Sequence, residues 1–276
     1  MTSNDEHRQA TATFDYSGSV VVVTGGSRGI GHGIASAFLA AGAEVVVCGR
    51  HRPPDSELPA ATGRAGSERR AHFVEADVRR AEDAAAVVDE AIARFGRLDV
   101  LVNNAGGSPE ADAATASPRF SEAVVALNLL APLHCAQAAN AVMQAQDGGG
   151  AIVNIGSVSG LRPSPGTAAY GASKAGLVSL TASLAIEWAP KVRVNCVSAG
   201  LVATDAAADH YGGADGMARV AATVPLGRFA TPADIAGLCL FLGSSAASYV
   251  TGANLVAHGG GERPAFLAAA ADQRPG

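Results

Sequence analysis

The sequence alternates short apolar runs with longer helix-forming segments along almost its whole length, and this order limits the folds it can adopt. The runs are rich in β-branched residues and rarely alternate with polar ones, as expected of parallel strands buried on both faces. They are Val20–Val23, Glu44–Cys48, His72–Glu75, Asp99–Val102, Ala151–Ile155, Val192–Val197 and Asn254–Ala257. The helical segments between them lie at about residues 30–41, 82–95, 121–145, 169–188 and 232–243.

A strand–helix order repeated this often predicts right-handed crossovers in a single doubly wound α/β domain of the Rossmann type. We expect a parallel sheet of about seven strands with helices on both faces. The domain is placed at residues 17–261, after a polar, flexible leader over residues 1–16 and before a C-terminal tail over residues 262–276. Two segments fit the alternation poorly. Prolines and glycines in residues 51–66 predict a loop or a frayed helix, and residues 205–222 are a second weak region.

Composition narrows the class of protein. Hydrophobic residues make up 48% of the 276 residues and charged residues only 16%, which provides a sizeable core and argues against disorder. No uninterrupted apolar run reaches the roughly 18 residues of a membrane-spanning helix, so no membrane partner is expected. The net charge of −5 disfavours nucleic acid as a partner. The four cysteines are far apart without a CxxC pair, which indicates buried free thiols, a reducing cytoplasm and no metal site.

A glycine-rich turn follows the first strand directly. It reads Thr24-Gly25-Gly26-Ser27-Arg28-Gly29-Ile30-Gly31 and leads into a helix. Such a turn presents backbone N–H groups and a helix N-terminus to a pyrophosphate, and glycine allows the ligand to approach the backbone closely. An ordinary tight turn is the alternative. The position after the first strand of an alternating chain favours nucleotide binding by Gly25, Ser27, Arg28, Gly29, Ile30 and Gly31.

The end of the second strand bears on the choice of cofactor. Dinucleotide folds that prefer NAD usually place an acid there for the ribose 2′-hydroxyl. Here the strand ends Val47-Cys48-Gly49-Arg50, without an acid in reach. Arg50 and Arg28 are placed to converge on one phosphate, to which the forked donors of a guanidinium are well suited. Two solvated surface arginines are the alternative. The pattern favours NADP (NADPH).

Tyr170 and Lys174 open a long helical segment and share one face of it, one turn apart. An ammonium group beside a phenol favours the phenolate, so Lys174 and the adjacent positive nicotinamide ring are together expected to lower the pKa of Tyr170 towards a range useful for acid/base chemistry. Alone, the pair also fits an amphipathic tyrosine beside a snorkelling lysine. Ser157 and Asn103–Gly106 follow two of the predicted strands, where ligands of such folds bind, and this favours a functional site.

Together these motifs resemble the short-chain dehydrogenase/reductase family, over about residues 17–260. The similarity is to its NADP-preferring branch, like the 3-oxoacyl-carrier-protein reductases. Several independent motifs in the right order make the resemblance specific. The matching motifs are Thr24–Gly31, Asp77-Val78, Asn103–Gly106, Asn128, Ser157, Tyr170–Lys174 and Asn195 through Thr204.

The resemblance implies a role for each matching residue. Ser157 would hydrogen-bond the substrate oxygen, Tyr170 would exchange the proton, and Lys174 would bind the nicotinamide ribose and tune Tyr170. Asn128 would hold a water that relays protons from Lys174. The remaining cofactor contacts would come from Asp77 and Val78 at the adenine, Asn104, Ala105 and Gly106 near the ribose, and Gly200, Val202 and Thr204 around the carboxamide and diphosphate.

Three positions depart from the family pattern. Ala199 stands where the family usually has proline before Gly200, so we expect a more mobile loop there. His32 and Gly33 weaken the first helix slightly. His258 replaces a usual aspartate and is interpreted as a structural or interface residue rather than a catalytic one.

The sequence therefore predicts an NADP-dependent oxidoreductase that interconverts a small-molecule ketone and an alcohol. A catalytically silent NADP(H)-binding sensor of the same fold is the alternative. The loop from Asp205 to Thr223 is expected to form an adaptable, fairly apolar lid. The substrate stays open among a 3-oxoacyl thioester, a polyketide intermediate, a steroid fragment and a cyclic ketone. By resemblance we expect a homotetramer, with segments 121–145 and 169–188 pairing between subunits and residues Arg263–Leu267 packing near a neighbour.

Overall fold

The apolar runs form a seven-stranded sheet in which all neighbouring strands are parallel, in the order β5-β2-β1-β6-β7-β8-β9. The computed structural model describes residues 12–63, 66, 68–204, 207, 210–262 and 266. Each predicted strand is present and differs from its predicted bounds by two residues or fewer at either end. The strands are β1 Val20–Thr24, β2 Glu44–Gly49, β5 His72–Glu75, β6 Val100–Asn103, β7 Gly150–Ser157, β8 Val192–Ala199 and β9 Asn254–Ala257.

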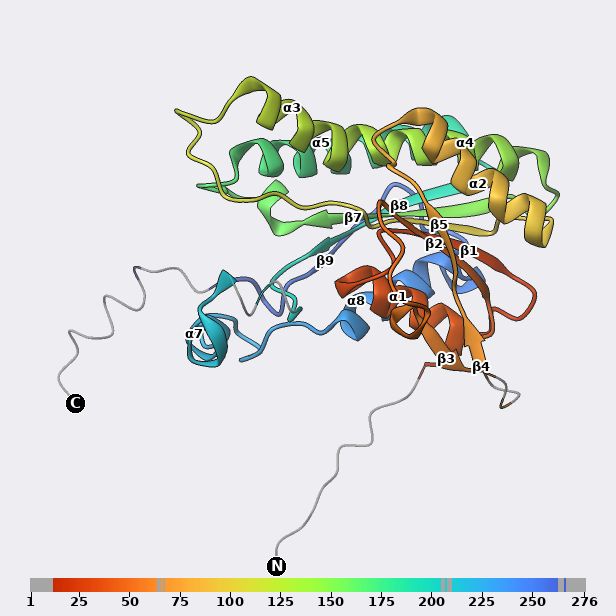
Figure 1. Ribbon diagram of the computed structural model, residues 1–276, viewed down its shortest axis with the longest axis horizontal. Coiled ribbons are helices and arrows are strands. Elements are labelled where there is room, and N and C mark those ends of the chain that lie inside the picture. Colours follow the sequence, from red (N-terminus) through yellow and green to blue (C-terminus); the bar gives the residue numbers. More distant parts are fainter. Residues whose placement is uncertain are drawn as a thin grey trace, which may run out of the picture.

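Helices cover both faces of the sheet (Figure 1), as the alternation predicts. On one face lie α1 (Gly29–Ala40) and α8 (Pro232–Gly243), whose Phe38 and Ile235 are fully buried in one apolar cluster. The other face carries α2 (Ala81–Phe95), α4 (Ala131–Ala145) and α5 (Ala168–Trp188), which contribute to a second cluster. The doubly wound Rossmann-like architecture is therefore confirmed.

The predicted helix 121–145 is a continuous helical stretch made of three parts. These are α3 (Pro118–Val125), a π-helical turn over Ala126–Leu130, and α4. By length and composition the stretch is apolar enough to cross a membrane, with a mean hydropathy of 1.2 and 39% of its most apolar window buried. Its buried residues Cys135 and Met143 pack in the core between the sheet and α2.

The segment 51–66 differs from its prediction. Its described residues form a 3₁₀ turn and a strand instead of the expected loop or frayed helix. After a 3₁₀ turn (Asp55–Glu57), β3 (Ala60–Thr62) and β4 (Glu68–Arg70) form a separate antiparallel pair. Leu58 is buried in the cluster beneath α1, and Arg69 pairs with Glu44 at 2.7 Å. These two contacts hold the β3–β4 pair against the domain. Neither contact can be predicted from local sequence patterns.

Tyr16, the last residue of the expected leader, packs into the core. Its ring lies edge-on against Phe38, and its hydroxyl donates to Leu240 O at 2.6 Å. Residues 1–11 and Arg263–Leu267, apart from residue 266, lie outside the described residues.

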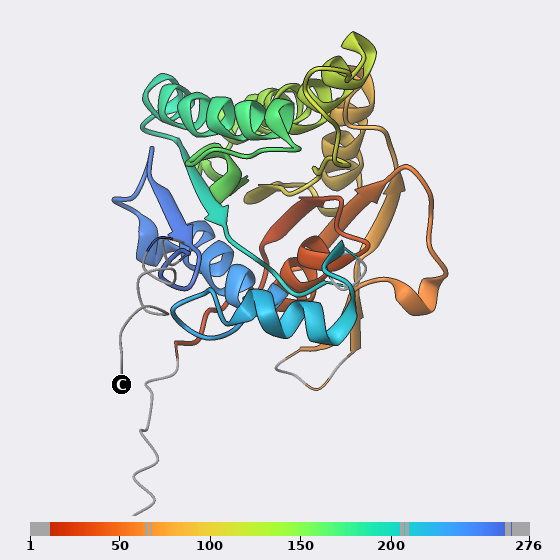
Figure 2. The same cartoon turned by 90° about the vertical axis from the view of Figure 1, so that its left-hand side faces the viewer.

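The second weak region is partly helical. Four of its residues lie outside the described part of the chain, but Gly213–Ala221 forms the helix α7. Figure 2 shows α7 in pale blue on the side of the molecule turned towards the viewer. Tyr211, just before α7, packs against Phe229 with ring centroids 5.5 Å apart. This tertiary contact supports a helix that composition alone disfavours.

Candidate active site

The glycine-rich turn joins β1 to α1 as predicted. Gly25 and Gly29 adopt positive φ angles of 63° and 56°, a region that favours glycine. A Cβ at Gly31 would lie 2.4 Å from both Asn104 Nδ2 and Gly25 O, so only glycine fits there. Arg28, the N-cap of α1, makes no side-chain capping hydrogen bond. Helix N–H groups therefore face the turn without a cap, and this suits an anionic ligand.

Asn104 and Thr24 hold this turn against the end of β6. Asn104 Nδ2 donates to Thr24 O at 3.0 Å and to Gly25 O at 3.2 Å. In return, Thr24 Oγ1 accepts from the backbone N–H groups of Asn104 and Ala105, both at 3.0 Å. The role of Thr24 was missed from the sequence, although it lies within the quoted motif. Asn104 thus positions the turn.

The two predicted basic residues lie on different segments: Arg50 follows β2, and Arg28 lies in the turn after β1. Arg28 and Arg50 are both exposed, and a Cβ at Gly49 would lie 3.6 Å from Ser27 Oγ, which places Ser27 beside the strand end. Asp77 follows β5, where Arg79 Nε donates to its Oδ1 at 2.8 Å. This hydrogen bond, with a smaller contribution from the charge of Arg50, lowers the pKa of Asp77.

Two further features complete the strand end beside Asp77. Val78 is buried in the core, as an apolar residue bordering a nucleotide site can be. Arg79 was not predicted, and no sequence motif announces its pairing with Asp77.

The four predicted catalytic residues converge at the carboxyl end of β7. Ser157 is the last residue of β7, and Tyr170 and Lys174 lie in the first turns of α5. Lys174 Nζ donates to Ile155 O at 2.8 Å and lies 5.7 Å from the centre of the Tyr170 ring. A Cβ at Gly106 would be 2.7 Å from Asn128 Oδ1 and 3.2 Å from Lys174 Nζ, so Gly106 separates these two groups.

Asn128 is fully buried within the π-helical turn. Its Nδ2 donates to Val124 O and to Gly107 O, both at 2.9 Å, and its Oδ1 accepts from Gly107 N at 2.9 Å. The side chain therefore fixes the loop after β6, including Gly106. A π turn within a helix often marks a functional position. Gly107, which makes this reciprocal pair, was not predicted.

Burial dominates the titration of the central pair. The pKa of Tyr170 is raised by burial, an effect that the nearby hydroxyl of Ser157 partly offsets by hydrogen bonding. The pKa of Lys174 is lowered to about 8, because the ammonium group is almost completely removed from water. Of the two groups expected to lower the pKa of Tyr170, Lys174 and the nicotinamide ring, Lys174 does not offset the effect of burial. Sequence spacing shows that the two residues share a face but not how deeply they are buried.

The segment after β8 lies beside the glycine-rich turn. Val202 is buried and forms a parallel bridge with Ala230, while Thr204 lies near Gly29. Gly200 N donates to Ala257 O at 2.8 Å, and a Cβ at Gly200 would lie 2.8 Å from the backbone of His258. Both ends of this segment are thus fixed by backbone pairing, even though Ala199 lacks the φ restraint of proline.

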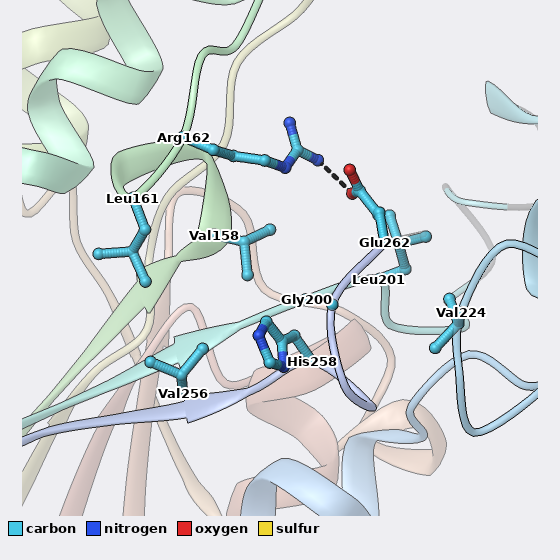
Figure 3. Close-up of a pocket in the computed structure, with 10 residues that line it drawn as sticks. Val158, Leu161, Arg162, Gly200, Leu201, Val224, Val256, His258 and Glu262 are labelled. Atoms are coloured by element: carbon cyan, nitrogen blue, oxygen red, sulfur yellow. Dashed lines mark hydrogen bonds and ion pairs between the residues drawn. The ribbon is translucent and has the colours of Figure 1, made fainter. Parts of the chain in front are cut away.

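A cavity of about 360 Å³ is lined by Val158, the residue that follows Ser157 in the chain (Figure 3). His258, which the sequence suggested to be a structural or interface residue, is one of the residues that line the cavity. The other lining residues come from the segments that follow β7 and β8, from β9 and its C-terminal end, and from the loop before α8. They are Val158, Leu161, Arg162, Gly200, Leu201, Val224, Val256, Gly261 and Glu262.

Comparisons with known proteins agree with this geometry. Residues 25–262 match the sequence model of the family described as enoyl-(acyl carrier protein) reductase. The chain is 37% identical over 257 residues to a D-threitol dehydrogenase of Mycolicibacterium smegmatis, covering 92% of this chain and 97% of that protein. It is also 37% identical over 243 residues to a 3-oxoacyl-[acyl-carrier-protein] reductase of Chlamydia muridarum, covering 87% and 95% respectively.

Among solved structures, one of a short-chain type dehydrogenase/reductase from Mycobacterium marinum superimposes with a TM-score of 0.80. Its sequence is 32% identical, and the match covers 91% of this chain and 98% of that one. Family and fold are therefore shared over nearly the whole length of the chain.

Proposed function

The chain belongs to the short-chain dehydrogenase/reductase family of oxidoreductases, and from this premise we propose that it interconverts a carbonyl group and a secondary alcohol. The observation that carries the proposal is the convergence of Ser157, Tyr170 and Lys174 at the end of β7. A hydroxyl donor, a buried phenol and a fixed amine beside one cavity match the needs of proton exchange with a substrate oxygen.

In this proposal Tyr170 gives its phenolic proton to the carbonyl oxygen during reduction and takes it back during oxidation. The hydroxyl of Ser157 donates a hydrogen bond to the same oxygen and stabilises the charge that develops on it. Lys174, fixed by Ile155 O, holds a positive charge near the phenol. Asn128 keeps the loop containing Gly106 in place, and its remaining lone pair or its main-chain carbonyl would hold the proton-relay water.

The turn after β1 fits a nicotinamide dinucleotide, because the N–H groups at the start of α1 face it without a side-chain cap and its glycines leave the backbone open to close approach. Gly25, Ser27, Gly29 and Ile30 would hold the diphosphate. The other contacts would come from Asp77, Val78, Asn104, Ala105, Gly106, Gly200, Val202 and Thr204, together with Tyr170 and Lys174. When bound, the nicotinamide supplies or accepts the hydride.

The direct test of this function is turnover with a panel of ketones and alcohols. We expect purified protein to consume NADPH with at least one uncharged ketone. Tight NADPH binding without turnover across the panel would contradict the enzyme proposal and would favour the silent sensor.

NADP is proposed as the cofactor, since β2 ends without an acid and the exposed Arg50 after β2 and Arg28 in the turn after β1 supply positive charge. Arg50→Ala is expected to raise the Kd for NADPH about three- to tenfold, because an exposed charge-assisted contact with a phosphate is lost. The Kd for NADH should stay within about twofold. Arg94→Ala, in the last turn of α2, is the matched control and should change neither constant. Equal Kd values for the two cofactors in the unchanged protein would contradict the assignment.

A homotetramer in the cytoplasm is proposed for the assembled enzyme. Ile186 on α5 is 82% exposed and Leu130 is 41% exposed, so the expected pairing helices present apolar side chains. The four buried free thiols suit a reducing compartment. Light scattering should give four times the chain mass, and a monomeric mass would contradict the tetramer.

A further inference from the structure

The cavity is lined by residues that directly follow two strand ends at the proposed site of reaction. Val158, which lines it, follows Ser157 directly in the chain. Gly200, another lining residue, follows Ala199, which is the register partner of Ser157 on the neighbouring strand. A substrate whose oxygen contacts Ser157 therefore has this cavity within reach of its non-reacting part. Its volume of about 360 Å³ is within the usual range for small-molecule sites.

Most of the cavity wall is hydrocarbon. Val158, Leu201 and Val224 contribute apolar side chains, and Figure 3 shows Val158 and Leu161 in the cavity below Arg162. Leu161 and Val256 remain 47% and 43% exposed. Apolar side chains exposed within a concave surface gain free energy when an apolar ligand covers them. The wall therefore favours a hydrocarbon group over a polyol.

The charges at the rim of the cavity neutralise each other. Arg162 Nη2 lies 2.5 Å from Glu262 Oε1, and this ion pair joins the segment after β7 to the segment after β9. Arg162 Nη1 also donates to Pro163 O at 3.1 Å. The guanidinium thus has an internal carboxylate partner, and a carboxylate on a ligand would have to compete with Glu262 for it.

We propose that this cavity binds the uncharged hydrocarbon part of the substrate, and that the Arg162–Glu262 pair at its rim discriminates against substrates carrying a carboxylate there. This specificity rests on the proposed carbonyl reduction for its biological meaning, but the binding itself does not require turnover. Arg162 and Glu262 are specificity-determining residues in this proposal and take no part in proton exchange.

Two ketones that differ only at the far end of the chain test the proposal. These are 2-octanone and 7-oxooctanoate, in which a carboxylate replaces the terminal methyl group. Calorimetry with protein saturated with NADP⁺ measures binding without reaction, because the oxidised cofactor has no hydride to give. The unchanged protein should bind 2-octanone more tightly.

Glu262→Gln frees Arg162 and should tighten 7-oxooctanoate binding about two- to fivefold relative to 2-octanone, the range expected of a partly exposed ion pair. The double change Arg162→Gln with Glu262→Gln should remove this gain. Asp147→Asn is the control and should leave both Kd values unchanged. It neutralises a carboxylate in the turn before β7, at the amino-terminal end of the strand whose carboxyl end carries Ser157.

Three outcomes of the binding experiment would overturn the proposal: tighter binding of 7-oxooctanoate by the unchanged protein, binding of neither ketone, or a gain that survives in the double variant. The proposed function fails separately. If both ketones bind as expected but no ketone is reduced with NADPH, the cavity assignment stands and the reaction assignment does not. Reduction of both ketones with equal KM would overturn the cavity assignment alone.

Discussion

Replacing Tyr170 by phenylalanine is expected to lower kcat by about 10²- to 10⁴-fold, the range that a positioned general acid or base contributes. Only the hydroxyl is removed, so the ring keeps its packing at the start of α5, and the Kd for NADPH should stay within about twofold. Steady-state kinetics and a binding titration on the same preparation measure both quantities. Tyr249→Phe is the matched control, because Tyr249 is fully exposed and far from β7 in the chain.

The pH dependence adds a second readout to this prediction. Burial raises the pKa of Tyr170 above its ordinary value of 10, so the phenol keeps its proton at neutral pH. Reduction uses the protonated form and should fall only as the pH rises through that raised pKa. Oxidation uses the phenolate and should rise over the same interval. In the Tyr170→Phe protein the residual rate should lack this dependence. Activity equal to that of the unchanged protein would remove Tyr170 from the mechanism.

The fold and much of the site were accessible from the sequence, because both depend on local patterns. Strand β1 is recognisable because it is an unbroken apolar run. The turn through Gly31 is recognisable because glycine is required there. Ser157 and Tyr170 were identified through their positions after a strand and at the start of a helix. The order of strands and helices then brings these separate motifs to one edge of the sheet.

Features that depend on long-range packing were not predicted. The π turn at Asn128 exists because its amide group bonds Gly107, which is 21 positions away in the chain. The pair between Arg162 and Glu262 joins residues 100 positions apart. The raised pKa of Tyr170 follows from burial, which spacing along α5 does not report. Each of these requires knowing which distant segments meet.

The buried charge of Lys174 is proposed to serve the reaction, but its desolvation destabilises the fold. Its ammonium group is buried, with 3% of the residue exposed, and burial lowers its pKa from 10.5 to about 8. At about 1.4 kcal/mol per pH unit, this corresponds to a desolvation penalty of roughly 3 kcal/mol at neutral pH. Between about pH 8 and about pH 10.5 the unfolded chain keeps a proton that the native chain has released. The free energy of unfolding of the unchanged protein should therefore rise with pH across this window.

Lys174→Met removes the charge and also the hydrogen bond to Ile155 O, whose loss costs about 1 to 2 kcal/mol. At about pH 7 the desolvation penalty that the variant avoids is larger than the loss of this hydrogen bond. The variant should therefore be more stable than the unchanged protein by about 1 to 2 kcal/mol. Near pH 10.5 the unchanged lysine is neutral, and the variant should instead be less stable by about 1 to 2 kcal/mol. Urea unfolding at the two pH values measures this reversal.

The same variant should lose activity while it gains stability at neutral pH. Removing a preorganised charged donor beside the reacting groups is expected to lower kcat about 10²- to 10³-fold. The matched control is Lys191→Met, since Lys191 is the other lysine of the chain, is exposed, and donates to Gln144 O at 2.8 Å. It should cause a small stability loss that does not reverse with pH, and no loss of kcat. If Lys174→Met were less stable at both pH values, the buried ammonium group would stabilise the fold, and the proposed desolvation penalty at neutral pH would be wrong.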